Sequence, residues 1–242
     1  MHKRVILGIF VCSLVVSGCD NPNASQAFTE PAKPAANQKV GKVLAFEVCN
    51  IGKNIAFRDG LSQVWADIKV NGGHSNDWVA TGLAVAKQLG AVGGATDVQV
   101  YVYRSDLGEL DTKATPNGYK WLTLVHYAVT PQHSLGTSGG GTPWLISYAT
   151  DDSVVTPKAI LIERDYQRLM DKYGRPDIDD KVVALIKKKY RIKGEWDLPH
   201  TNLDKNTVNP DEFFIDKNGQ SGNLDRLGPL LNKAARNFEC SV

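Results

Sequence analysis

The segment whose composition first suggests chemistry is a glycine-rich run at residues 136–142, which reads GTSGGGT. Consecutive glycines can present backbone amides that hold a phosphate group. A phosphate-binding loop, however, needs a Gly-Lys-Ser or Gly-Lys-Thr sequence at the start of a helix. No lysine follows this run, and Pro143 and Trp144 instead begin an expected strand. We therefore interpret residues 136–142 as a loop between two strands.

Histidines are the next candidates, because imidazole can act as a base or as a metal ligand near neutral pH. His74, His126, His133 and His200 follow the N-terminal segment, and none belongs to a HExxH or His-x₃-His pattern. We expect His126 on an apolar strand face, as a hydrogen-bonded core residue. His74, with Asp77 three residues later, is more typical of a helix start than of a catalytic dyad. The patterns predict no metal site and no cofactor, and they leave the catalytic residues unassigned.

Two further segments carry charge patterns. Asp216 begins the sequence DKNGQ, but a calcium loop would need Gly and Glu where this chain has Ser221 and Leu227. We interpret that segment as a polar turn. Residues 181–193 contain six Lys and Arg, and residues 177–180 contain three Asp. Acids before bases are typical of a helix that complements its own macrodipole; contact with anionic lipid headgroups is the alternative interpretation.

The first eighteen residues indicate export rather than fold. His2, Lys3 and Arg4 form a short basic region, and the twelve residues 5–16 are mostly apolar. A helix of that length rises only about 18 Å, too little for a hydrocarbon core of about 30 Å. The pattern therefore predicts that residues 1–18 are a signal peptide.

Residues 16–19, which read VSGC, resemble the lipobox of bacterial lipoproteins. The resemblance covers about the first twenty residues; an ordinary secretory signal with an incidental cysteine is the alternative. In that family the cysteine thiol is diacylated, the peptide is cut before it and the new α-amine is acylated. The resemblance implies lipidation at Cys19 and a periplasm-facing protein held to a membrane of the bacterial envelope by its lipid. Asp20 and Asn21 resemble the enterobacterial signal for retention in the inner membrane.

We predict a disulfide bond between Cys49 and Cys240. Cys12 leaves with the signal peptide and Cys19 carries the lipid, so these two thiols remain. An even pair in an oxidising compartment is usually bonded. The alternative is a nucleophilic Cys49, but that chemistry prefers a cysteine at a helix N-terminus, and Cys49 is expected at the end of a strand.

Composition and charge limit the class of protein. The chain has 242 residues, 42% of them hydrophobic and 22% charged, which is typical of a folded domain. The net charge of +2 falls to about zero once Lys3 and Arg4 leave with the signal peptide. A chain without excess positive charge is not expected to bind nucleic acid.

The remaining chain is organised as a tether and one domain. Residues 19–39 comprise the lipidated cysteine and a flexible segment with three prolines and no apolar period. Residues 40–242 are expected to form a single globular domain, with possible lobes at 40–150 and 151–242. Alternating or continuous apolar runs predict strands, and 3.6-residue periods with caps predict helices. The expected strands are 43–48, 98–103, 119–129 and 144–149, the expected helices are 76–89, 157–173, 179–190 and 229–238, and residues 61–70 fit either type.

This order, with strands mostly first and helices mostly last, predicts an α+β fold. We expect a mostly antiparallel sheet with packed helices and a helical C-terminal lobe, because strands in quick succession pair antiparallel. Residues 194–222 are rich in Asn, Asp, Gly and Pro and are expected to be irregular.

Three classes of function are compatible with such a protein. The first is a non-enzymatic envelope module that binds a protein partner, the second an envelope hydrolase acting on peptidoglycan, peptide or lipid, and the third a binder of a small solute. We favour the first because no catalytic constellation is evident. A hydrolase requires titratable side chains that converge in one cleft, whereas a solute binder requires a pocket and a partner-binding module an exposed apolar surface.

Overall fold

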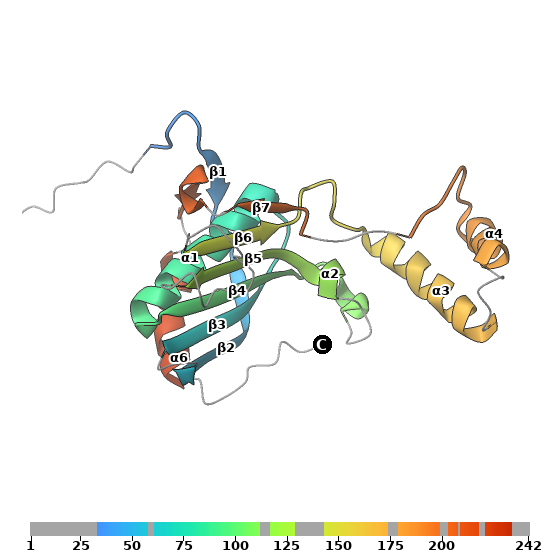
Figure 1. The fold of residues 1–242 in the computed structure, drawn as a ribbon. Helices are drawn as coiled ribbons and strands as arrows, with labels where there is room; N and C mark the ends of the chain where they lie inside the picture. Colours follow the sequence, from blue (N-terminus) through green and yellow to red (C-terminus); the bar gives the residue numbers. More distant parts are fainter. Residues whose placement is uncertain are drawn as a thin grey trace, which may run out of the picture. The chain divides into compact units, whose positions relative to one another are not determined.

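The computed structural model describes residues 33–57, 61–111, 117–128, 143–173, 179–198, 203–207, 209–217 and 221–233. The chain divides into two units, Met1–Lys33 and Pro34–Val242, and every described strand and helix lies in the second unit. Its six-stranded mixed sheet and its helices confirm the predicted α+β class (Figure 1).

The central sheet has the strand order β2-β3-β4-β5-β6-β7. All of its neighbouring pairs are antiparallel except β3 and β4, which are parallel. A parallel pair needs a crossover connection, and helix α1 supplies it. The strands are β2 (Phe46–Phe57), β3 (Leu61–Val70), β4 (Asp97–Arg104), β5 (Trp121–Ala128), β6 (Trp144–Tyr148) and β7 (Lys205–Thr207).

Strand β3 resolves the ambiguity of residues 61–70. Val64, Ala66, Ile68 and Val70 alternate along it and are at most 1% exposed. The helical alternative fails because the segment pairs with β2 on one side and β4 on the other. Those two ladders provide partners for the backbone groups that a helix would have bonded internally.

Helix α1 (Ser75–Gly93) is longer than the expected helix at 76–89. It packs its buried residues, among them Val79, Leu83 and Leu89, into the same core cluster as the valines of β4. A Cβ at Gly82 would lie 2.9 Å from a methyl group of Val125, so a small residue lets the helix approach the sheet. Gly94, in the left-handed conformation, ends the helix.

Strand β2 corrects one expectation about Cys49. The first core strand was expected to end at residue 48, whereas β2 continues to Phe57 and Cys49 lies inside it. The register with β3 shifts between Val48 and Asn50, which places Cys49 at a bulge. The long hairpin pairing with β3 extends the strand through a segment that is only partly apolar.

Helices α3 (Pro157–Tyr173) and α4 (Asp179–Tyr190) form as predicted. Their facing residues make an apolar cluster separate from the sheet core, with Ile162, Tyr166, Val182 and Ile186 at its centre. Asp165 of α3 accepts hydrogen bonds from Lys189 and from the Tyr190 hydroxyl of α4. No helix in the described part of the chain is long and apolar enough to cross a membrane.

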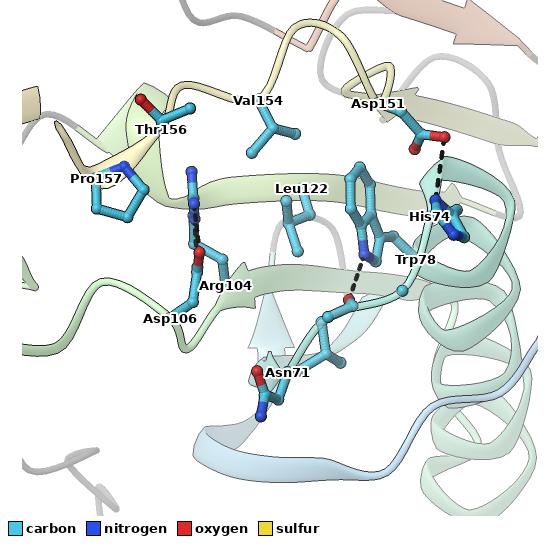
Figure 2. Close-up of a pocket in the computed structure, with 13 residues that line it drawn as sticks. Asn71, His74, Trp78, Arg104, Asp106, Leu122, Asp151, Val154, Thr156 and Pro157 are labelled. Carbon is cyan, nitrogen blue, oxygen red and sulfur yellow. Dashed lines mark hydrogen bonds and ion pairs between the residues drawn. The ribbon is translucent and has the colours of Figure 1, made fainter. Parts of the chain in front are cut away.

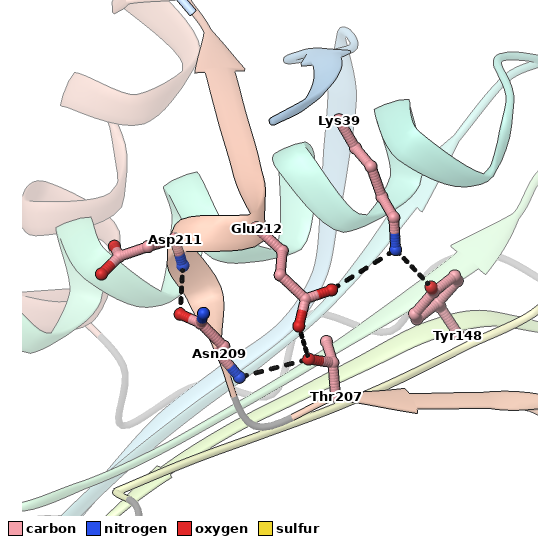
Figure 3. Close-up of polar contacts among 6 residues, drawn as sticks. All are labelled: Lys39, Tyr148, Thr207, Asn209, Asp211 and Glu212. Carbon is pink, nitrogen blue, oxygen red and sulfur yellow. Dashed lines mark hydrogen bonds and ion pairs between the residues drawn. The ribbon is translucent and has the colours of Figure 1, made fainter. Parts of the chain in front are cut away.

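The expected irregular stretch contains two short strands, β7 and β8 (Phe213–Asp216). Strand β8 pairs in parallel with β1 (Lys39–Lys42), so the first strand of the domain lies beside residues far along the chain. Figure 3 shows the polar contacts at this junction: Lys39 Nζ lies 3.4 Å from Glu212 Oε2 and 3.3 Å from the Tyr148 hydroxyl. Helices α5 (Ser221–Asp225) and α6 (Leu227–Lys233) follow, so the last helix begins two residues before its expected start.

Candidate functional site

A pocket of about 480 Å³ lies where the parallel strands β3 and β4 end (Figure 2). Val70 and Arg104, the last residues of these strands, line it together with the loop that leads into α1 and the segment between β6 and α3. The carboxyl ends of parallel strands are where open α/β sheets commonly bind ligands, because the connecting loops diverge there. The pocket volume falls within the range of small-molecule sites.

The floor of the pocket is apolar and buried. Val70, Trp78 and Leu122 are buried, and the Trp78 indole N–H donates to the Gly72 carbonyl at 2.9 Å. Gly72 and Gly73 have φ values of 68° and 83°, which L side chains rarely adopt. The two glycines therefore let the chain turn from β3 into α1 beside the N–H edge of the indole ring.

Arg104 forms one wall through a two-point ion pair with Asp106. Its Nε and Nη2 atoms each lie 2.6 Å from a carboxylate oxygen of Asp106, and Nη1 donates to the Val155 carbonyl at 2.5 Å. Hydrogen bonding from this guanidinium holds the pKa of Asp106 below its usual range, against the opposing effect of burial. The wall is thus positioned by three hydrogen bonds and is neutral as a pair.

His74 and Asp151 form a second polar pair at the rim of the pocket. His74 Nδ1 lies 3.3 Å from Asp151 Oδ2, and Asp151 Oδ1 accepts the Ser75 backbone N–H at 2.6 Å. Asp77 accepts the His74 backbone N–H at 3.2 Å, which supports the interpretation of His74 and Asp77 as a helix start. Two carboxylates therefore already complement the positive end of α1.

The lining of the pocket offers little for covalent catalysis. Among the described residues of the lining, the only hydroxyl belongs to Thr156, which accepts the Ala159 backbone N–H at 3.2 Å and caps α3. The pair of His74 and Asp151 thus has no nucleophile beside it within the lining. Across the described ranges, no group of three or more His, Cys, Asp or Glu is arranged to hold a metal ion.

A second pocket, of about 500 Å³, lies along α3 and beside Tyr119. Burial and a hydrogen bond with Glu163 raise the pKa of Tyr119. Apart from Tyr119 its lining comes from α3 alone, with Arg164 and Arg168 opposed by Glu163 and Asp171. One helix face with balanced charges provides fewer convergent groups than the site at β3 and β4.

His126 lies in the core, outside both pockets. Its Nε2 is 2.9 Å from Asp97 Oδ2, and the two side chains are 3% and 2% exposed. Gln63 donates to the other Asp97 oxygen at 3.1 Å. This agrees with the interpretation of His126 as a hydrogen-bonded core residue.

Of the three site residues predicted from the sequence, Cys19, Cys49 and Cys240, only Cys49 lies among the described residues. Cys49 is 8% exposed and is not a free thiol. Cys19 and Cys240 lie outside the described residues, as do the glycine-rich run at 136–142, His133 and His200. Lipidation at Cys19 and the pairing of Cys49 with Cys240 therefore stay predictions.

Comparison with known proteins gives no family for this chain. No family model matches it, and no curated protein matches it. One solved structure is similar, that of a DUF487 family protein from Desulfovibrio piger, at 16% sequence identity and a TM-score of 0.38. That match covers 69% of this chain and 94% of the other.

Proposed function

We propose that this chain is a lipid-anchored lipoprotein of the bacterial envelope, and that its domain is a non-enzymatic module which binds a small neutral or cationic solute. The envelope assignment rests on the resemblance of residues 16–19 to a lipobox, after a basic region and a short apolar run. The binding assignment rests on the pocket at the ends of β3 and β4.

The observation that carries the binding assignment is the pairing of polar groups around an apolar floor. The ion pair of Arg104 with Asp106 forms one wall, and the exposed pair of His74 with Asp151 lies at the rim, around Trp78 and its apolar neighbours. A few placed polar groups on a mostly apolar surface are typical of small-molecule sites. Hydrolysis is less well supported, because the single hydroxyl of the lining serves as a helix cap.

Charge determines which solute the pocket favours. The N-terminus of a helix often binds phosphate. The N-terminus of α1, however, is already complemented by Asp77 and Asp151. A phosphate group placed beside them would be repelled, and Arg104 is already neutralised by Asp106. A neutral or cationic solute avoids this repulsion, and for that reason we assign the pocket to such a ligand.

Thermal unfolding with added solutes tests the proposal. The chain from Pro34 onward contains every described strand and helix, and it can be heated with monosaccharides, amino acids, polyamines or organic phosphates. A solute at about 100 times its Kd should raise the melting temperature by roughly 5–10 °C. We expect this from a neutral or cationic compound and not from the phosphates.

Two tryptophan variants locate the binding site. Val154→Trp places a large side chain into the pocket and should abolish the shift. Leu161→Trp changes an exposed residue of α3 outside this pocket and should preserve it. Equal shifts in both variants, or a phosphate as the best ligand, would contradict the proposed site.

A further inference from the structure

The residues of the α3 and α4 helices carry a charge that the rest of the chain does not. Residues 157–193 contain eleven Lys and Arg against six Asp and Glu, a net charge of +5 in a chain whose total is +2. The remaining residues are thus negative as a group. A local excess of this size is an electrostatic feature of one segment and not of the whole protein.

The exposed side of α4 gathers this charge around a leucine. Lys181, Leu185 and Lys188 are spaced four and three residues apart, so they lie on one face of the helix, and all three are exposed. Leu185 is 44% exposed, while Val182 and Ile186 face the apolar cluster shared with α3. We name the surface formed by Lys181, Ala184, Leu185 and Lys188 the basic stripe.

The basic stripe itself contains no acidic side chain, although the exposed Asp180 lies at its edge, four residues before Ala184. Asp179 accepts a hydrogen bond from the Tyr166 hydroxyl at 2.7 Å, on the side of α4 that faces α3. Asp165 of α3 pairs with Lys189, which lies beside the stripe. The macrodipole accounts for bases near the helix C-terminus, but it does not account for Lys181 in the first turn or for an exposed leucine between lysines.

We infer that the basic stripe binds the surface of an anionic phospholipid bilayer. Lysines attract the headgroup phosphates, and their apolar stems let a neighbouring leucine enter the boundary between headgroups and acyl chains. We assign the stripe to a lipid surface because anionic headgroups complement its lysines. The proposed anchor at Cys19 keeps the domain close to such a surface. Twenty residues separate Cys19 from Lys39, so the domain stays within about 70 Å of the lipid even when the tether is extended.

The inference rests on the proposed lipid anchor only for keeping the domain near the bilayer. The contact between the basic stripe and the bilayer does not need the anchor, so the experiment uses protein without acyl chains. The chain from Pro34 onward is sedimented with vesicles of phosphatidylcholine alone or with 30% phosphatidylglycerol. We expect binding only to the anionic vesicles, weakened at 0.5 M salt because the shorter Debye length screens the lysines. Absence of binding to the anionic vesicles would overturn the inference and leave the anchor untouched.

Three variants distinguish binding through the basic stripe from attraction by the net charge of the protein. The double variant Lys181→Gln with Lys188→Gln should weaken the partition coefficient about thirtyfold, whereas Lys42→Gln with Lys87→Gln removes the same charge from exposed sites elsewhere and should change it little. Leu185→Ser should weaken binding without altering its salt dependence. Equal losses in the two double variants, or binding that Leu185→Ser leaves unchanged, would contradict a bilayer-inserting stripe.

Discussion

Arg104 and Asp106 are two residues apart, and their side chains meet in a two-point ion pair at the end of β4. The Arg104 side chain is 7% exposed, whereas that of Asp106 is 45% exposed. The buried cation is thus compensated by a carboxylate that reaches the solvent. This relationship gives the pocket a polar wall that carries little net charge.

Removing that carboxylate should destabilise the domain. Asp106→Asn leaves a buried guanidinium without its counter-charge, and we expect a loss of about 1–2 kcal/mol after allowing for solvent screening at Asp106. Urea unfolding at pH 7 measures the loss. A control at an exposed acidic residue without a described ion pair, Glu109→Gln, should change the free energy of unfolding by less than about 0.5 kcal/mol.

The same pair predicts a pH dependence with a definite sign. Arg104 holds the pKa of Asp106 below its usual value in the folded chain, whereas the unfolded chain binds a proton near pH 3.9. The stabilisation is therefore present above about pH 4 and is lost as the pH falls through the folded pKa. Between pH 5 and pH 3 the wild type should lose more stability than Asp106→Asn; parallel profiles would show that the pair contributes nothing.

The two glycines of the pocket loop should respond differently to alanine. Gly72→Ala meets open space, so its cost is the strain of a positive φ, about 1 kcal/mol. Gly73→Ala adds a contact of 2.6 Å with a methyl group of Leu44, and we expect about 1 kcal/mol more. Thermal unfolding of both variants measures the difference. Equal losses would mean that Leu44 moves aside freely.

The buried pair of His126 and Asp97 should show strong coupling. His126→Leu leaves a carboxylate that is 2% exposed with Gln63 as its described donor, and we expect a loss of about 3–5 kcal/mol. Asp97→Leu with His126→Leu removes both polar groups and should be less destabilising than the sum of the single changes. A double-mutant cycle by urea unfolding measures this, and strict additivity would argue against a functional hydrogen bond between the two side chains.

The predicted disulfide can be counted chemically. The chain from Pro34 onward, prepared in an oxidising compartment, contains no cysteine other than Cys49 and Cys240. Thiol titration of the denatured protein without reductant should find none reactive. The loop model gives up to about 5 kcal/mol for so long a closure, so reduction should lower the melting temperature markedly. Two reactive thiols in the oxidised preparation would refute the bond.

Helices α1, α3, α4 and α6 could be predicted from sequence because each has its own local signals. Helix α2 (Asn117–Lys120) instead occupies the start of an expected strand, and α5 begins in a stretch that was expected to be irregular. Thr156 and Pro157 begin α3, and the apolar period of α4 survives in a highly charged segment. Strands β7 and β8 could not be predicted, since β7 has three polar residues and exists through its pairing with β6. The second half of β2 was missed for the same reason: its conformation depends on β3.

The pocket could not be predicted from the sequence because residues from elements far apart along the chain pair in its lining. Helix α1 and the strands β4, β5 and β6 lie between His74 and Asp151 along the chain, and nothing local to Asp151 indicates that it caps α1. One signal was present: Gly72 and Gly73 lie between a possible strand and a helix start, which is the pattern of a loop at the carboxyl end of a parallel strand. The ambiguity of residues 61–70 concealed it.

Metabolic labelling with a radioactive fatty acid tests directly whether Cys19 carries a lipid. Full-length wild-type protein expressed in a bacterial host should take up label, lose residues 1–18 and sediment with membranes. Cys19→Ser should remain an unprocessed precursor without label, while Cys12→Ser, a change inside the predicted signal peptide, should behave as wild type. A Cys19→Ser protein that is processed and localised like the wild type would contradict the account.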